Sequence, residues 1–398
     1  MNSINCLRPS RLPRPMNSEF QPFRLAQARR IRRLTLEGVG EKVGLTKQAI
    51  GNFERGDRTP TPINLRAVSR ALDFPSAFFL KPRGLIEAAR KSVEHYRSLK
   101  KVRAVAMERE RAVALAELCA ALFDDLSTYL DIHPPILEPG VDLEQDFLDI
   151  NDQQVEDAAR DLRKHWGLGD GPISNLCLLV ENHSLPVFAT SLKHGMDGLS
   201  LWQGGVPLIM VSSAANVFRS RMNVAHELGH LVMHQGVDSD VFDDKERFKV
   251  IEDQAWRFGG AFLLPQGSFL SEVYSISLDG LLVLKERWKV SIAAIIQRLR
   301  QLEIIDQRKA QSLFVQLSQR GWRKKEPLDD EFAPESPQWF NHAASAVCEG
   351  YSIKLAEFAS DTRLPIWFLA EVLKVSEDRL LGLDRADRTN VVKFKMRA

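Results

Sequence analysis

Three residues that can support metal chemistry lie close together between Arg221 and His234. His226, Glu227 and His230 form the pattern His-Glu-x-x-His inside a mostly apolar, helix-forming stretch. Residues four apart on an α-helix lie about 40° from each other around the axis, so both histidines project from one face. Two imidazoles at this spacing can chelate one Zn²⁺, and Glu227 then lies where a carboxylate can accept a proton from water.

The pattern also occurs by chance, so the flanking residues must decide between a metal site and an ordinary helix. Those residues are apolar: Val224, Ala225, Leu228, Leu231 and Val232. The helix is therefore expected to be buried, and burying its polar triplet without partners would cost several kcal/mol. Because a metal ion supplies the missing partner, we predict a buried zinc-binding helix.

A catalytic zinc needs a third protein ligand and one open position. His234 lies about 80° around the helix from His226, so we expect it to line the pocket or to face solvent. Glu252 is a better candidate, because it lies in a predicted amphipathic helix on the side of Ala255. A carboxylate near that packed face needs a partner, which a zinc ion can provide.

The N-terminal part of the chain predicts short helices over residues 23–32, 35–43 and 47–55, followed by a further helix from Ile63 to Leu72. Capping and turn residues stand at the helix ends: Thr35, Gly44, Thr46 and Gly56. Two short helices joined by a tight glycine turn describe a helix-turn-helix.

This stretch, with its Glu54-Arg55-Gly56 ending, resembles the XRE/Cro-type helix-turn-helix domain. The resemblance implies binding of double-stranded DNA, with Arg55 near the backbone and groove-facing residues Thr46, Lys47, Gln48 and Asn52. Gly40 stands where the family usually has alanine. A small helical bundle that contacts only proteins is the alternative, and two DNA half-sites would suggest a homodimer.

Composition and charge agree with this organisation. At 398 residues the chain is long enough for two or three domains, and its hydrophobic content of 44% is enough to form their cores. The net charge is only +2, but residues 1–58 hold twelve Lys and Arg against five Asp and Glu, an excess of seven that indicates a polyanionic partner. Four scattered cysteines suit a reducing compartment, and no apolar run is long enough for a membrane span. We therefore expect a cytoplasmic protein.

The two central motifs together resemble the ImmA/IrrE family of metallo-endopeptidases. They are His-Glu-Leu-Gly-His at 226–230 and Glu-x-x-Ala-x-x-Phe-x-x-x-Phe-Leu-Leu-Pro at 252–265. The resemblance implies one Zn²⁺ per chain, held by His226, His230 and Glu252, with Glu227 as the base. Because this chain has glutamine at 254, where an acidic residue is common, the third ligand could instead be Asp253.

The expected fold class is mainly α with a small antiparallel β-sheet (α+β), whose strands lie at 185–189, 199–202 and 207–211. A helix over 172–181, capped by Ser174, precedes them. We expect five segments in chain order: a disordered tail (1–19), the helix-turn-helix domain (20–82), a helical connector (83–135), a zincin-like metallopeptidase domain (136–323) and a C-terminal helical region (324–398). The last could recognise the target protein or serve as a plain helical cap.

The family resemblance implies hydrolysis of a regulatory protein, such as a repressor or antitoxin. The alternative is a helix-turn-helix transcription regulator or antitoxin whose zinc site is structural or sensory. An intact Glu227 favours the peptidase, because a structural site needs ligands but no base.

Overall fold

The computed structural model describes residues 7–8, 19–84, 91–96, 103–132, 137, 147–203, 206–234, 237, 241 and 244–383. These residues form two compact units. One unit holds the described parts of 89–106 and 133–337, and the other those of 4–88, 107–132 and 338–398. The predicted boundaries after residues 19, 82, 135 and 323 stay predictions. Most of the predicted disordered tail lies outside the described residues.

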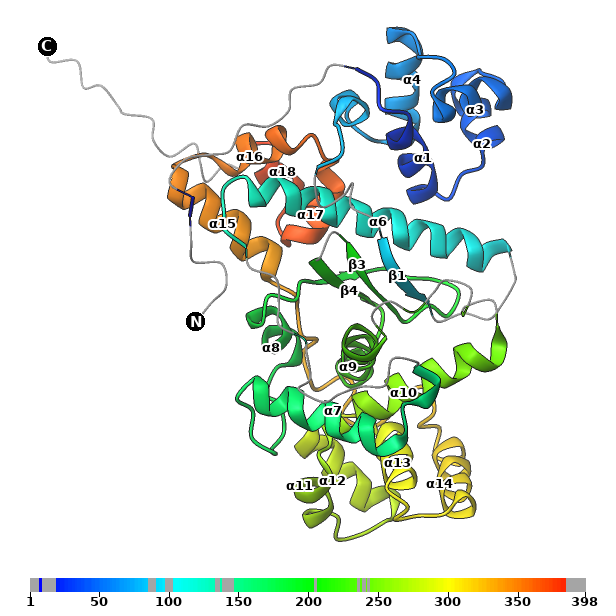
Figure 1. The fold of residues 1–398 in the computed structure, drawn as a ribbon, viewed down its shortest axis with the longest axis vertical. Coiled ribbons are helices and arrows are strands. Elements are labelled where there is room, and N and C mark those ends of the chain that lie inside the picture. The colour runs from blue at the N-terminus through cyan, green and yellow to red at the C-terminus, as the bar shows by residue number, and fades with distance from the viewer. Residues whose placement is uncertain are drawn as a thin grey trace, which may run out of the picture. The chain divides into compact units, whose positions relative to one another are not determined.

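One unit is almost entirely helical (Figure 1). Threonines open three of its first helices, since Thr35, Thr46 and Thr61 each accept a hydrogen bond from a backbone N–H three residues on. The elements are α1 (Pro22–Ile31), α2 (Leu36–Val43), α3 (Lys47–Arg55), α4 (Pro62–Leu72), η1 (Ser76–Leu80), most of α6 (Arg103–Ser127), α15 (Trp339–Tyr351), α16 (Leu355–Thr362), α17 (Ile366–Leu373) and α18 (Glu377–Leu380).

The C-terminal helices pack on the helices that precede them within this unit. Trp367 of α17 donates a hydrogen bond to the backbone oxygen of Asp73 (3.0 Å) and meets the ring of Phe74 edge-on at 5.7 Å. Trp339 of α15 stacks on Phe123 of α6 at 5.0 Å. Such contacts are those expected of a helical cap.

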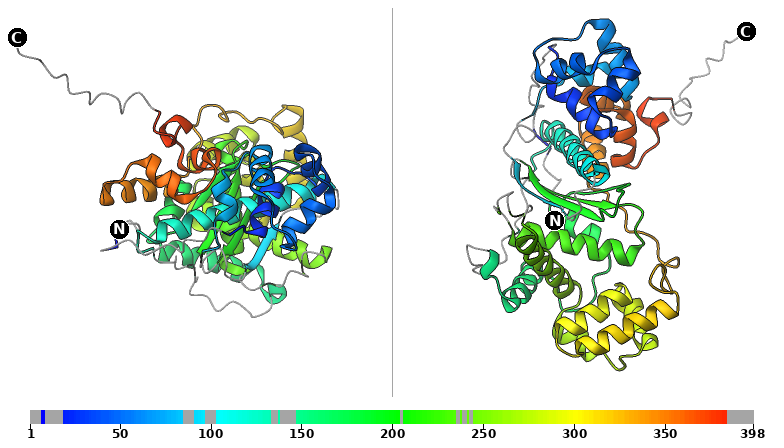
Figure 2. Two further views of the ribbon diagram at one scale, coloured as in Figure 1. Left: turned by 90° about the horizontal axis from the view of Figure 1, so that it is seen from above. Right: turned by 90° about the vertical axis from the view of Figure 1, so that its right-hand side faces the viewer.

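The other unit combines a sheet with helices. Its elements are β1 (Lys91–Tyr96), η2 (Phe147–Asp149), α7 (Asp152–His165), α8 (Leu176–Asn182), β2 (Val187–Thr190), β3 (Gly198–Gln203), β4 (Val206–Ser212), α9 (Val217–Met233), α10 (Lys245–Leu263), α11 (Gln266–Ser271), α12 (Leu278–Trp288), α13 (Ile292–Gln301) and α14 (Gln307–Gln319). Helix α9 lies against the sheet, and α11 to α14 lie on the far side of α9 and α10 from it (Figures 1 and 2).

The fold class is confirmed, but the sheet is mixed. Its strand order is β1-β3-β4-β2, and β3 pairs with β4 antiparallel as predicted. The prediction of a wholly antiparallel sheet is wrong, because β2 pairs with β4 in parallel. Strand β3 is inserted between β2 and β4 in the chain, so β2 and β4 can run in the same direction.

Two other predictions need correction. Residues 91–96 form strand β1 on the edge of β3, so the connector is not helical throughout. Helix α8 begins at Leu176 rather than Pro172, because Asn175, and not Ser174, caps it by accepting from the N–H of Leu178. None of the described helices has both the length and the apolar character needed to cross a membrane.

Candidate metal centre

Helix α9 carries the His-Glu-x-x-His residues through the core of its unit. Its first turn is capped by Asn216, whose side chain accepts a hydrogen bond from the N–H of Arg219. Every residue from Arg221 to Met233 is buried, against β3, β4 and α10. The predicted buried helix is therefore confirmed.

Two glycines let α9 and α10 approach closely enough to bring their polar residues together. A Cβ atom at Gly259 would lie 3.0 Å from Cε of Met222 and 3.1 Å from the backbone nitrogen of His226. A Cβ at Gly229 would lie 3.0 Å from the ring of Phe258. Because these distances are shorter than normal van der Waals contact, a methyl group at either position would force the neighbouring atoms to shift by a few tenths of an ångström.

The close packing brings His226, His230 and Glu252 together. The Nε2 atoms of the two histidines are 3.1 Å apart, and Glu252 oxygens lie 3.8 Å from Nε2 of His226 and 3.4 Å from Nε2 of His230. The side chains expose only 3%, 2% and 13% of their surface. Three ligand atoms within 4.8 Å of one another can hold a metal ion, and two imidazoles with one carboxylate suit zinc.

The neighbouring carboxylate, Asp253, does not join this group. It is exposed and lines a cavity beside the centre. Position along α10 explains the difference, because consecutive helix residues point about 100° apart around the axis. The geometry thus favours Glu252 over Asp253.

Glu227 follows His226 on α9, and its carboxylate contacts strand β3. Its Oε2 accepts a hydrogen bond from the hydroxyl of Ser200 on β3 at 2.7 Å. A Cβ at Gly198, also on β3, would lie 2.6 Å from Oε1 of Glu227, so only glycine leaves room for the carboxylate. The structure therefore positions Glu227 through β3, apart from the three candidate ligands.

A chain of hydrogen bonds orients the ring of His230. The amide nitrogen of Gln254 donates to the backbone oxygens of Phe147 (2.7 Å) and Ile150 (3.0 Å), so its Oε1 accepts from Nε2 of His234 (2.9 Å). Burial, and next the proximity of His230, lower the pKa of His234 to about 3, which keeps it neutral. Its Nδ1 then accepts from Nδ1 of His230 (2.9 Å), and the other ring nitrogen of His230, Nε2, faces His226 and Glu252.

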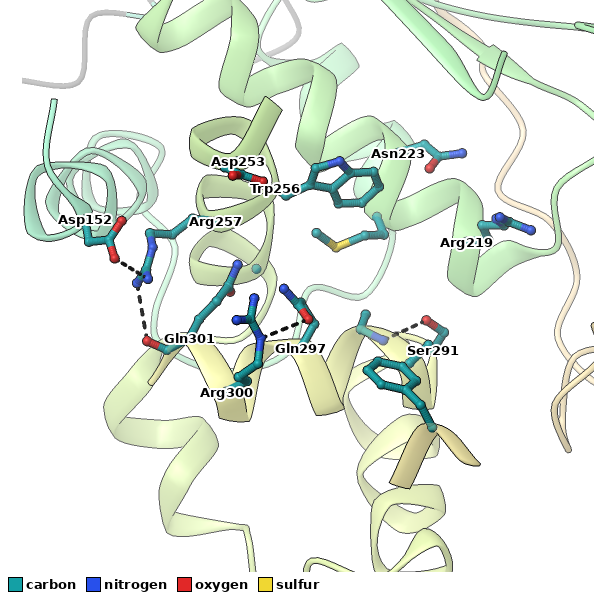
Figure 3. Close-up of a pocket in the computed structure, with 15 residues that line it drawn as sticks. Asp152, Arg219, Asn223, Asp253, Trp256, Arg257, Ser291, Gln297, Arg300 and Gln301 are labelled. Atoms are coloured by element: carbon teal, nitrogen blue, oxygen red, sulfur yellow. Dashed lines mark hydrogen bonds and ion pairs between the residues drawn. The ribbon is translucent and has the colours of Figure 1, made fainter. Parts of the chain in front are cut away.

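A cavity of about 550 Å³ lies beside the centre (Figure 3). Trp256 links the two, because its ring lines the cavity and its centroid lies 4.3 Å from that of His226. Met222 and Asn223, one helical turn before His226, also line it. Among the residues described, the three candidate ligands are not part of the cavity lining.

The predicted DNA-contacting residues lie on or beside α3. Thr46 is exposed but its hydroxyl accepts from the N–H of Ala49, so it caps the helix. Lys47 and Gln48 are exposed in the first turn. The side chain of Arg55 donates to Asn52 (2.5 Å) and to Asp57 (2.8 Å), so these residues hold one another.

Two contacts fix the position of α3 within its domain. Arg29 of α1 forms two hydrogen bonds with the carboxylate of Glu54, at 2.6 and 2.9 Å. A Cβ at Gly40 would lie 2.4 Å from the backbone oxygen of Leu45, so glycine at this position permits the tight turn between α2 and α3. This close contact with Leu45 explains why the chain has glycine at position 40, where the helix-turn-helix family usually has alanine.

Sequence reasoning missed the residues that hold the metal centre in place. These are Ser200, Gly198, Gln254, Trp256 and the two close-contact glycines of α9 and α10. Gly198 and Ser200 stand in the run Met196-Asp197-Gly198-Leu199-Ser200. Their position two residues apart on one strand was the signal that could have placed both against Glu227.

Comparison with known families matches two parts of the chain. Residues 180–300 match the IrrE N-terminal-like domain of peptidase family M78, and residues 25–79 match a helix-turn-helix family. No curated protein matches the chain. The first match covers the sheet strands β2 to β4 and both helices of the candidate metal centre, and the second covers most of α1 and all of α2 to α4. The chain therefore carries an M78 peptidase domain of the IrrE type together with an N-terminal helix-turn-helix DNA-binding domain.

Proposed function

We propose that this chain is a zinc-dependent endopeptidase that cleaves a regulatory protein of the repressor or antitoxin type. The convergence of His226, His230 and Glu252, with Glu227 alongside, is the observation that carries the proposal. A site that only stabilised the fold would need the three ligands but no adjacent carboxylate.

In the proposed reaction, different side chains bind the metal, transfer the proton and position the base. His226, His230 and Glu252 would hold Zn²⁺, which supplies Lewis acidity to polarise a peptide carbonyl and to acidify water. Glu227 accepts the proton of the attacking water on a carboxylate oxygen and later delivers it to the leaving amine. The hydroxyl of Ser200 keeps the Glu227 carboxylate in place through their 2.7 Å hydrogen bond.

The helix-turn-helix domain would direct the peptidase to double-stranded DNA. Exposed Lys47 and Gln48 in the first turn of α3 are suited to contact phosphates and base edges. Because repressors and antitoxins also occupy DNA, a DNA-bound peptidase would meet such substrates at raised local concentration.

The proposal can be tested without knowing the substrate, by comparing the new protein N-termini that form in cells. Wild type and Glu227→Gln are expressed at equal levels, and N-terminal peptides are labelled and sequenced. We expect a small set of cleavage products that appear with wild type only. The same products with Glu227→Gln would show that another protease makes them and would contradict the proposal.

An alternative function is transcription regulation through a structural or sensory zinc. The observation in its favour is the burial of the site, where the most exposed of the three ligand side chains, Glu252, reaches only 13%. Under this alternative, zinc would change DNA affinity equally in wild type and Glu227→Gln. Absence of any wild-type-specific cleavage, together with that result, would favour the regulator.

A further inference from the structure

Strand β1 pairs with the part of β3 that holds Glu227. The two strands are antiparallel, and the register places His95 opposite Ser200. Ser200 donates the 2.7 Å hydrogen bond to the Glu227 carboxylate. Because neighbouring strands lie about 4.8 Å apart, the backbone of β1 occupies the edge of β3 beside the proposed base.

Without β1, this edge of β3 would be free to bind a peptide. Strands β1, β3 and β4 lie side by side in Figure 1, and β2 follows β4 at the opposite edge of the sheet. A free edge binds an extended peptide through backbone N–H and C=O groups, which every peptide offers. A substrate that pairs with β3 beside Glu227 needs the same backbone groups as β1, so the two cannot pair with β3 at once.

Strand β1 lies outside the matched peptidase domain. The family match begins at residue 180 and includes β2 to β4, whereas β1 ends at Tyr96. In the chain, β1 stands between two segments of the helical unit, 4–88 and 107–132. The strand is therefore an addition to the peptidase sheet, and the chain on both sides of it leads to the unit that carries the helix-turn-helix domain.

Two features of β1 favour its release from the sheet. Its register with β3 shifts between Ser92 and Glu94, whereas β4 pairs with β3 without a shift. A shift of this kind leaves a residue unpaired and interrupts the ladder. Lys91 and Glu94 are also residue types that are depleted in strands. A short, interrupted strand at a sheet edge opens at a lower free-energy cost than a continuous central strand.

We propose that β1 is an autoinhibitory strand, which keeps substrate off β3 until it leaves the sheet edge. The inference rests on the proposed peptidase function. A strand attached to its own domain reaches an effective concentration of ~1 mM at its binding site. A substrate present at a lower concentration therefore competes poorly for the same edge. Release of β1 increases substrate binding without changing the candidate metal ligands or Glu227.

Peptide binding measures the release of β1 without catalysis in the full-length, zinc-loaded Glu227→Gln protein. The probe is a fluorescent peptide with the sequence of residues 90–97, Arg-Lys-Ser-Val-Glu-His-Tyr-Arg. His95→Gly together with Tyr96→Gly weakens β1 in the half that pairs beside Ser200. Fluorescence anisotropy should then show the probe binding about tenfold more tightly than to the protein with native β1. Equal binding to the two folded proteins would overturn the proposal.

Two controls distinguish strand exchange from nonspecific binding. A probe with proline in place of its histidine and tyrosine lacks two backbone donors and should not bind to the glycine variant. Tyr274→Gly removes an aromatic side chain that is 91% exposed in a loop outside the sheet, and should leave probe binding unchanged. Equally tight binding of the proline probe would contradict pairing with β3.

A reversible cross-link provides a second test if the glycine variant does not fold. Lys91 and Gln203 are register partners at the end of β1 away from His95, and residues directly opposite each other have Cα separations that a disulfide can span. In Lys91→Cys/Gln203→Cys, oxidation should weaken probe binding about fivefold or more, and dithiothreitol should restore it. Lys91→Cys alone should show no such change. Probe binding that the cross-link does not affect would exclude β1 as the competitor.

Cleavage separates this inference from the proposed function. With a substrate identified by N-terminal labelling, the glycine variant with Glu227 intact should show about tenfold higher kcat/KM and little change in kcat. An unchanged kcat/KM would contradict autoinhibition and leave the peptidase. Probe binding that depends on β1, with no cleavage by either protein, would contradict the peptidase and retain β1 as an exchangeable strand.

Discussion

In the candidate metal centre, the predicted ligand side chains are buried, whereas the predicted DNA-contacting side chains Lys47 and Gln48 on α3 face solvent. His226 and His230 expose 3% and 2% of their side chains, while Lys47 and Gln48 are exposed. The histidines and Glu252 come from two helices that two glycines allow to approach. The α3 residues come from one short helix held by the pairing of Arg29 with Glu54.

The difference shows how much surrounding structure each kind of chemistry requires. A buried ligand set must be oriented in advance, because water cannot substitute for a misplaced group. Exposed DNA-contacting side chains need only a rigid helix, since they complete their hydrogen bonds on the nucleic acid. Substitutions at the centre should therefore have larger and more varied effects than those on α3.

The largest expected effect is the loss of hydrolysis in Glu227→Gln. Removing a general base lowers the rate by about 10²–10⁴-fold. The variant should retain zinc, because Glu227 is not among the three candidate ligands. Steady-state cleavage of a substrate identified by N-terminal labelling measures the change, and near-wild-type turnover would remove Glu227 from the mechanism.

A matched pair of glycine substitutions compares the packing of the two regions. Gly259→Ala should destabilise α10 by about 1–3 kcal/mol, because its methyl group would meet backbone and side-chain atoms of α9. Gly51→Ala should stabilise α3 by about 0.5–1 kcal/mol, because the methyl meets only the flexible end of Arg55 and Leu36. Hydrogen exchange of amides in each helix reports these changes separately; shifts of the same sign would refute the contrast.

On α3, Gln48→Ala and Lys47→Ala should affect DNA binding in different ways. If Gln48 contacts a base, its loss should cost about 1–3 kcal/mol of affinity and relax the preference at one position of a selected site. Loss of Lys47 should weaken all sequences alike and reduce the salt dependence by about one counterion. Thermal unfolding should not change in either variant, because both side chains are exposed.

An effect confined to acid pH concerns the stability of the metal-free protein. The pKa of His234 is lowered to about 3, mainly by burial, so below the ordinary value of 6.5 the unfolded chain binds a proton that the folded chain does not. Stability should therefore fall as pH falls from 6.5 towards 3, by at most about 1.4 kcal/mol per pH unit from this residue. His234→Gln should show a shallower decline in urea unfolding between pH 6.5 and 5; an identical decline would show that other groups dominate.

Residues that act through spacing within one helix could be predicted from the sequence. His226, Glu227 and His230 follow helical periodicity, and Glu252 was identifiable from its place on an amphipathic helix. Contacts between distant segments could not be predicted in the same way. Ser200 reaches Glu227 across 27 residues, and no local pattern specifies that approach. Strand β1 was missed because its sequence, Lys91 to Tyr96, stands among helix formers, and pairing with β3 decides its conformation.

Counting bound zinc in four purified proteins by native mass spectrometry tests the central claim most directly. We predict one zinc in wild type and in Glu227→Gln, and none in His226→Ala or Glu252→Ala, with circular dichroism confirming that each protein retains its helices. This outcome would separate the three ligands from the base. Zinc retained by Glu252→Ala but lost from Glu227→Gln would contradict the account, because it would make Glu227 a ligand.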